Sequence, residues 1–361
     1  MSTLHRFVAA ASVVLSFATG CASCAQQGVG VIQGPINDPS NRTLRRDMLA
    51  LGVSQFCSEA QKHSAPLKMN DDQPVVGRFF PRQCTAKTLD NGDLSVSLAG
   101  EGYAWTNVSK KVTFGMTAAA VYDQDFLMSG PTLYAYFRTR PNQPPASNFQ
   151  SRIIETTSPL SGLALPFVGQ VTAPFTAMAD NFGRQLVTGE LQKGFTVIRE
   201  PDGTTDFGLG VIEKGAHPAH AFDVHGSSKL TYENTRVEIH QNQRDFVGPI
   251  VIEESGRAIY VTATLDGVQA IDALYMRQGE AEASIRYYLD APQATPLAGA
   301  PMVSDVVQAG VRYQRTLPMP KGSYYLVFDN TALAGQVSPV VNALDDRAAV
   351  VSYVVQIGDA P

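Results

Sequence analysis

Histidines gather in one short segment of this 361-residue chain. Within residues 217–225 stand three imidazoles and one carboxylate, those of His217, His220, Asp223 and His225. Imidazole nitrogen and carboxylate oxygen are donors that zinc and related divalent metals take from proteins. One hypothesis is therefore a metal site formed by these four residues, and with it a periplasmic metal-dependent hydrolase.

The same segment also has a simpler interpretation. Pro218 stands between His217 and His220 and prevents a regular helix there. A zinc site usually draws its ligands from separate elements with supporting hydrogen bonds around them, which one short loop does not show. The alternative is an exposed polar loop between two domains, with no cofactor, whose histidines change charge near about pH 6.5.

Known catalytic motifs are missing from the sequence. The chain has no His-Glu-x-x-His, no Gly-x-Ser-x-Gly and no Ser-x-x-Lys motif, and no phosphate-binding Gly-x-x-x-x-Gly-Lys loop. Gly208-Leu209-Gly210 begins like a dinucleotide loop, but Glu213 occupies the place of the third glycine. These observations favour a non-catalytic protein.

The N-terminus has the layout of a signal peptide over residues 1–20. Arg6 precedes an apolar run at 7–18, which is shorter than the roughly 18 residues that a spanning helix needs. Small residues then lead to Cys21. The pattern predicts an exported protein.

The residues before Cys21 resemble a bacterial lipobox. Ala18-Thr19-Gly20-Cys21 matches it at the small positions, although leucine is usual where Ala18 stands. The resemblance implies cleavage before Cys21, a lipid on its sulfur and a membrane anchor. Because Ala22 and not aspartate follows, it also implies the outer membrane; ordinary secretion is the alternative.

Cysteine usage agrees with an oxidising compartment. With Cys21 assigned to lipid and Cys24 in the leader, Cys57 and Cys84 remain. A disulfide between them would stabilise the fold by about 3 to 4 kcal/mol on the chain-entropy model. Two buried free thiols are the alternative, and a metal site is less favoured because neither cysteine belongs to a Cys-x-x-Cys motif.

Length, composition and charge narrow the class of protein. At 361 residues the chain exceeds the usual size of one core, which predicts two domains. The charged fraction of 17% suits an exported β-rich protein. A net charge of −5 without a run of Lys or Arg excludes nucleic acid as a partner.

The first half of the chain predicts an α+β domain over 41–215, after a flexible tether at 21–40. Apolar spacing predicts a helix at 43–62, and alternation predicts strands at 94–98, 111–122, 133–138, 194–198 and 206–212. Asp90-Asn91-Gly92 predicts a turn, and Trp105 is expected in the core. The uncharged run 156–179 contains three prolines; we expect a buried connection into a helix near 172–192, a pocket lining or, less favoured, a membrane-dipping segment.

The second half predicts an antiparallel β-sandwich over 227–361. Its expected strands lie at 236–240, 248–253, 258–265, 283–289, 311–317, 323–328 and 348–357. The stretch from Gly322 to Asn330 has the pattern Gly-x-Tyr-x-Leu-x-x-x-Asn. It resembles the end of GOLD-type and prepeptidase C-terminal-type modules, which implies an accessory binding or adhesion role.

The predicted fold class is thus mainly β with some α, an α+β domain followed by a sandwich. The predicted function is that of a lipid-anchored envelope lipoprotein with a binding or structural role. An apolar ligand or another envelope protein would be its partner, because many strand positions are apolar and no catalytic set is assembled.

Overall fold

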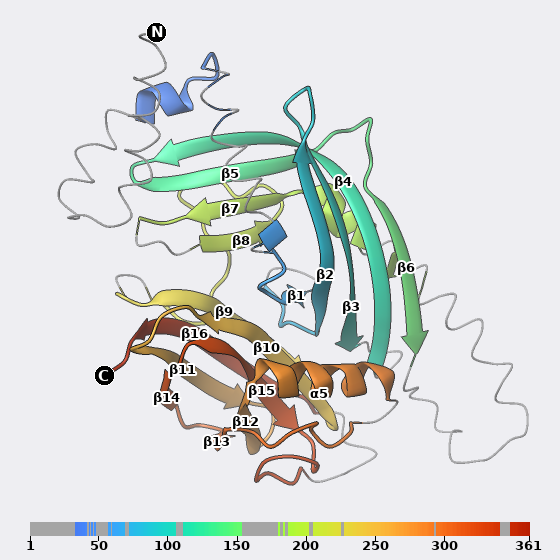
Figure 1. Ribbon diagram of the computed structural model, residues 1–361, viewed down its shortest axis with the longest axis vertical. Coiled ribbons are helices and arrows are strands. Elements are labelled where there is room, and N and C mark those ends of the chain that lie inside the picture. Colours follow the sequence, from blue (N-terminus) through green and yellow to red (C-terminus); the bar gives the residue numbers. More distant parts are fainter. Residues whose placement is uncertain are drawn as a thin grey trace, which may run out of the picture.

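Antiparallel sheets make up most of this protein, as the mainly β prediction requires (Figure 1). The computed structural model describes residues 33–41, 43, 45, 47, 57–58, 60–68, 72–105, 111–153, 180, 183–184, 187–201, 205–224, 227–291, 294–339 and 347–361. None of the helices in these residues is long and apolar enough to cross a membrane.

The first half of the chain forms one curled eight-stranded sheet. Its strands are β1 (Ala65–Leu67), β2 (Gly77–Thr88), β3 (Leu94–Trp105), β4 (Lys111–Ser129), β5 (Thr132–Thr139), β6 (Ala146–Ile153), β7 (Phe195–Arg199) and β8 (Thr205–Leu209). The curl follows from the length of β4, because β6 pairs with its first part and β5 with its second part. The sheet therefore divides along β4, and β5, β7 and β8 turn away from β6.

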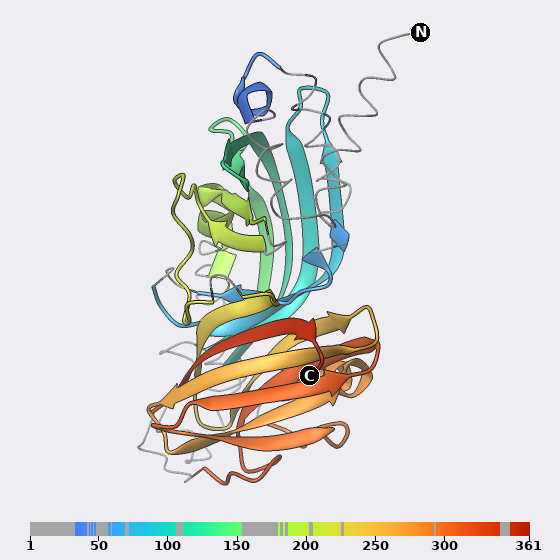
Figure 2. The same cartoon turned by 90° about the vertical axis from the view of Figure 1, so that its left-hand side faces the viewer.

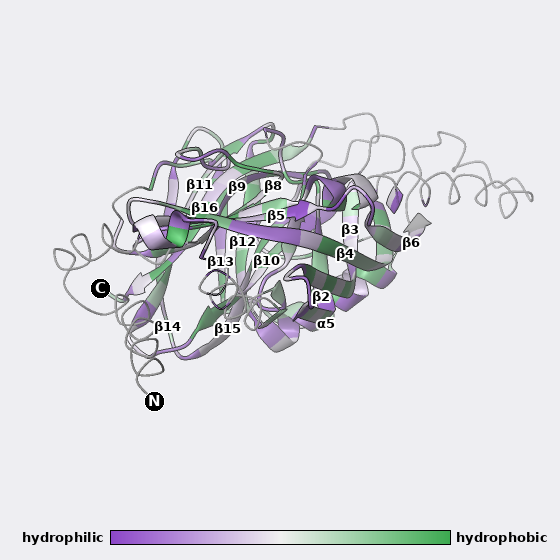
Figure 3. Cartoon of the chain, turned by 90° about the horizontal axis from the view of Figure 1, so that it is seen from above, coloured by the Kyte–Doolittle hydropathy of each residue, from purple (hydrophilic) through white to green (hydrophobic). Residues whose placement is uncertain are grey.

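Local sequence explains the hairpins of this sheet. The predicted turn at 90–92 is confirmed: Gly92 has a φ of 89°, and the side chain of Asn91 accepts a hydrogen bond from the backbone of Asp93. Along β4, Ala118, Ala120 and Tyr122 are buried while the residues between them are more exposed. Hydrophobic and hydrophilic residues alternate in this way along several strands (Figure 3).

Aromatic rings fill one part of the curled sheet. Phe79, Phe114 and Phe149 stack in sequence, with ring centroids 6.3 Å and 4.9 Å apart. Gly102 makes room for them, because a Cβ there would lie 2.6 Å from the ring of Phe114. This part of the sheet is thus filled by aromatic side chains from three of its strands, β2, β4 and β6.

The second half forms two four-stranded antiparallel sheets, ordered β10-β15-β12-β13 and β14-β11-β16-β9. Their strands are β9 (Leu230–Ile239), β10 (Gln243–Ile252), β11 (Arg257–Asp266), β12 (Ala270–Arg277), β13 (Val303–Gln308), β14 (Tyr313–Met319), β15 (Gly322–Asn330) and β16 (Ala349–Asp359). One apolar cluster is shared by both sheets; Ile250, Tyr275 and Leu326 join it from one sheet, Val261 and Val355 from the other.

One predicted strand of this half is wrong. Residues 283–289 belong to helix α5 (Gln278–Asp290), which buries Ala281, Ile285, Tyr288 and Leu289. Their spacing of four, three and one residues fits one face of a helix, and that face packs on the β10-β15-β12 surface. Aromatic and β-branched composition suggested a strand, but the contact with the sheet beneath favours the helical period.

The other predicted strands and helices agree with the structure only in part. Strands β1, β2, β6, β12 and β13 lie where no strand was predicted. Of the described residues of the predicted 43–62 helix, 43, 45, 47, 57–58 and 60 are helical, whereas 61–62 form a turn. Residues 180, 183–184 and 187–193, near the second predicted helix, are helical. Residues 33–37, placed in the tether, form a helical turn in which Gln33 and Asn37 donate side-chain hydrogen bonds to the carbonyl of Met128. The run 156–179 and Cys21 lie outside the described residues.

Two further sequence predictions are confirmed. Cys57 and Cys84 form a disulfide with their Cα atoms 5.3 Å apart, which ties residue 57 to β2. Trp105 is buried at the end of β3, where its ring stacks on His240 with centroids 3.7 Å apart.

The two halves meet over a broad apolar contact. Phe80 and Tyr103 of the curled sheet join Phe246, Tyr288 and Tyr325 in one buried cluster. The start of β2 and the end of β3 therefore reach the second half at the surface on which α5 also packs. Figure 2 shows the curled sheet above the two sheets of the second half. The halves are packed as one body at this junction.

Candidate functional site

Residues 211–224, here called the strap, connect β8 to the second half. The strap lies over one face of β5 and β7, where Ile212 packs on a buried cluster of Tyr134, Tyr136 and Ile198. Gly208 allows this approach, because a Cβ there would lie 2.2 Å from the side chain of Ile212. The segment is thus seated on the sheet.

Backbone hydrogen bonds fix the strap at both ends. The Ile212 amide donates to the hydroxyl of Thr196 at 3.0 Å, and the Gly215 amide donates to the hydroxyl of Tyr134 at 3.0 Å. At the other end the amides of 221 and 222 both donate to the side-chain oxygen of Asn234, at 3.1 and 3.0 Å. The strap therefore joins β5 and β7 of the first half to β9 of the second.

Two histidines of the strap face one carboxylate. Oδ2 of Asp206 lies 3.5 Å from Nδ1 of His217 and 3.2 Å from Nε2 of His220. On the far side of His217, its Nε2 lies 3.8 Å from Oε1 of Glu200, whose other oxygen accepts a hydrogen bond from Thr132. We call the four ionisable residues the histidine row; in it, acid and imidazole alternate.

The electrostatics of the row favour ion pairing. Burial opposes ionisation of Asp206, but hydrogen bonds from His220 and His217 outweigh it and lower the pKa of this carboxyl. The hydrogen bond to Asp206 raises the pKa of His220 above its ordinary value, against burial and the charge of Lys68. Protonated histidine and ionised aspartate therefore support each other here.

The structure places the predicted metal ligands as follows. His217 and His220 do come together, but the carboxylate they face is Asp206, which the sequence analysis did not single out. Asp223 is exposed on the strap, and His225 lies outside the described residues. Among the described side chains, no group of three or more His, Cys, Asp and Glu residues could hold a metal ion.

The sequence gives only a weak indication that Asp206 lies beside the strap. It lies in β8, two residues before Gly208, so both residues lie on the face of the strand that the strap covers. A loop that follows a hairpin can fold back over it, but the sequence does not say over which face.

A second charged cluster lies at the junction of the halves. Arg78 of β2 is fully buried and holds Asp245 of β10 through two hydrogen bonds of 2.7 and 2.8 Å. The same guanidinium donates to Glu233 of β9 at 2.9 and 3.1 Å. Tyr103 donates to Asp245, and Tyr353 donates to Glu233. We call these five residues the junction cluster, and its geometry holds the halves together.

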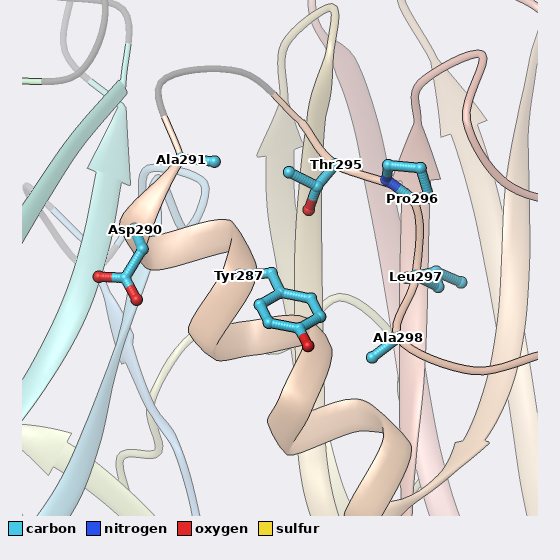
Figure 4. A pocket seen from close by; sticks show the side chains of 7 residues that line it. All are labelled: Tyr287, Asp290, Ala291, Thr295, Pro296, Leu297 and Ala298. Atoms are coloured by element: carbon cyan, nitrogen blue, oxygen red, sulfur yellow. The ribbon is translucent and has the colours of Figure 1, made fainter.

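A groove runs between α5 and residues 295–298, with a volume of about 530 Å³ (Figure 4). It is lined by Tyr287, Asp290, Ala291, Thr295, Pro296, Leu297 and Ala298. The ring of Tyr287 is 55% exposed and lies opposite Leu297 and Ala298, whereas Asp290 points to the other side of the helix end. An open, mostly apolar groove of this kind suits contact with an apolar group.

The walls of this groove are held in place from beneath. Buried Arg244 donates a hydrogen bond to the carbonyl of Thr295, and the backbone amide of Ala298 donates to the hydroxyl of Ser284 at 2.9 Å. At the end of α5, Lys111 from β4 donates to the carbonyls of Tyr288 and Ala291. The walls of the groove are therefore held by contacts within the protein itself.

Comparison with known proteins adds little. No protein-family model and no curated protein matches the chain. Among solved structures, the exo-β-1,3-galactanase of Phanerochaete chrysosporium with galactose is similar over 81% of this chain and 84% of its own, at 7% identity and a TM-score of 0.21. A likeness at this TM-score carries no argument about this chain.

Proposed function

We propose that this protein is an outer-membrane lipoprotein, anchored through Cys21, that acts by binding an envelope partner and not by catalysis. In this proposal, 41–215 is an α+β domain and 227–361 is a β-sandwich domain. The shared core of the two four-stranded sheets supports the sandwich.

The single observation that carries the binding role is the filled junction. Ligand sites of two-domain enzymes commonly lie in the cleft between domains. In this protein buried Arg78 and the apolar cluster around Tyr103 occupy the contact between the halves. A rigid body with its partner site on the outside follows from this arrangement.

The groove beside α5 is the proposed contact point on that outside. It exposes one aromatic ring, Tyr287, above the small apolar wall of Pro296, Leu297 and Ala298. Exposed tyrosines rimmed by apolar side chains are frequent anchors at protein interfaces. We propose an apolar side chain of an envelope protein as the occupant, with a free apolar ligand as the alternative.

Intact-mass spectrometry of membrane-extracted protein tests the anchor. The wild type should begin at Cys21 and carry acyl mass, and Cys21→Ala should lose both. Cys24→Ala is the matched control, which should keep the acyl mass. An unlipidated wild type cut elsewhere would overturn the anchor and make the protein freely secreted.

Photocrosslinking in intact cells tests the binding role. A photoreactive residue at position 287 should give a discrete adduct, while one at exposed Leu333 should give none. Adducts of the same size at both positions, or at neither, would contradict a partner at the groove.

A further inference from the structure

The strap covers an apolar surface on one face of β5 and β7. Tyr134, Tyr136 and Ile198 project to the face of β5 and β7 beneath Ile212, while Phe137 and Phe195 project to the opposite face and belong to the interior cluster. The two faces are therefore closed by different elements. Removing the strap would expose one of them and leave the other intact.

The polar contacts of the strap are of two kinds. The four amide bonds at Ile212, Gly215, Ala221 and Phe222 do not titrate in the neutral range. The contact of His220 with Asp206 does, because an imidazole gains or loses its proton near neutral pH. The charged groups that face the two imidazoles are Asp206 from β8, Glu200 after β7 and Lys68 after β1.

We propose that the strap is a pH-responsive clasp, held on β8 while the imidazole of His220 is protonated and loosened when it loses this proton. In the protonated state the positive ring of His220 lies 3.2 Å from the carboxylate of Asp206. After proton loss this carboxylate faces a neutral ring, and the ion pair between strap and strand is gone. The exposed fractions of these side chains, between 14% and 28%, place the row where water screens it only in part.

Opening would expose a second apolar surface, separate from the proposed groove. Tyr134 and Tyr136, 2% and 6% exposed in the closed form, would become accessible on one face of the curled sheet. This inference does not depend on the lipid anchor or on the partner of the groove, because the row and the strap belong to the folded body.

Hydrogen exchange of the purified full protein at pH 5.5 and 7.5 tests the clasp, with rates corrected for the intrinsic effect of pH. The four strap amides are direct reporters. We expect their opening equilibrium to be up to about fivefold more favourable at pH 7.5. The variant His220→Gln should lose this difference, while His63→Gln, which replaces an exposed histidine in contact with Tyr232, should keep it.

Equal protection at both pH values in the wild type would overturn the clasp, as would an unchanged pH difference in His220→Gln. An NMR titration of the wild type covers the case in which the variant fails to fold. The amide shifts of Gly215 and Ala221 should follow the titration of the His220 ring; amide shifts that ignore it would overturn the proposal.

Discussion

The junction cluster and the histidine row both join distant parts of the chain, but they differ in burial. In the junction cluster Arg78 and Asp245 have side chains that are 0% and 2% exposed, whereas His217 and Asp206 of the row are 28% and 14% exposed. Water can replace a lost partner at the row. It cannot do so at the junction, where a charge left alone stays in a low-dielectric interior.

The difference shows how one fold can combine a permanent contact with an adjustable one. Arg78 carries a charge at every pH at which proteins fold, so a change of pH does not remove the positive charge of the junction cluster. The row places positive charge on the imidazole of His220, whose pKa is raised by Asp206 and which loses its proton as pH rises. Burial and the choice of cation thus decide which contact responds to conditions.

The largest expected effect comes from Arg78→Ala, because it leaves the carboxylates of Asp245 and Glu233 buried beside each other. We expect the free energy of unfolding to fall by about 3 to 5 kcal/mol in a denaturant titration. The matched control is Arg82→Ala on the same strand, whose ion pair with Glu101 is exposed. Arg82→Ala should lower the free energy of unfolding by about 0 to 1 kcal/mol. Similar losses in the two variants would contradict the difference between the buried and the exposed ion pair.

Removing the disulfide should have the next largest effect. The Cys57→Ala, Cys84→Ala variant loses a crosslink between residues 27 positions apart, which corresponds to about 3.5 kcal/mol on the chain-entropy model. Because the junction couples the halves, the loss should lower the stability of one cooperative transition followed by fluorescence and circular dichroism. Two separate transitions would show instead that the halves unfold independently.

The smallest effect is the pH dependence of the row. The pKa of His220 is raised, so its contribution is fully present below about pH 6.5 and is lost as pH rises through the folded value. The pKa of Asp206 is lowered, so its contribution is present above about pH 4 and is lost as pH falls through the folded value.

His220→Gln should therefore remove up to about 1 kcal/mol of stability at pH 5.5 and less at pH 8. Unfolding titrations at these two values measure the difference. A variant that loses the same amount at both would assign His220 a role in packing and none in ion pairing.

Local patterns in the sequence were enough to predict the elements that depend on residues close together in the chain. The turn at Asn91-Gly92 and the strand starting at Lys111 follow from turn chemistry and alternation. β8 ends at Leu209, three residues before the predicted limit, because Gly210 has a φ of 79° and turns the chain into the strap. Helix α5 was missed because its aromatic and β-branched residues also suit a strand.

The charged contacts could not be predicted in the same way. Arg78 and Asp245 are 167 residues apart, and nothing near either residue indicates a partner. His217 and His220 were visible as a group because they are close in sequence, but Asp206 meets them only after the strap folds back over Gly208. Long-range pairing is a property of the packed sheets and not of a local motif.

Lys111 bears on the order in which the chain folds during synthesis. Helix α5 has no basic residue in its last turn and an aspartate at its end, so the positive charge at its carboxyl end comes from β4, 177 residues earlier. The ribosome makes the curled sheet before α5. Lys111, Phe80 and Tyr103 therefore lack their contacts with this helix until the chain has been synthesised as far as residue 290.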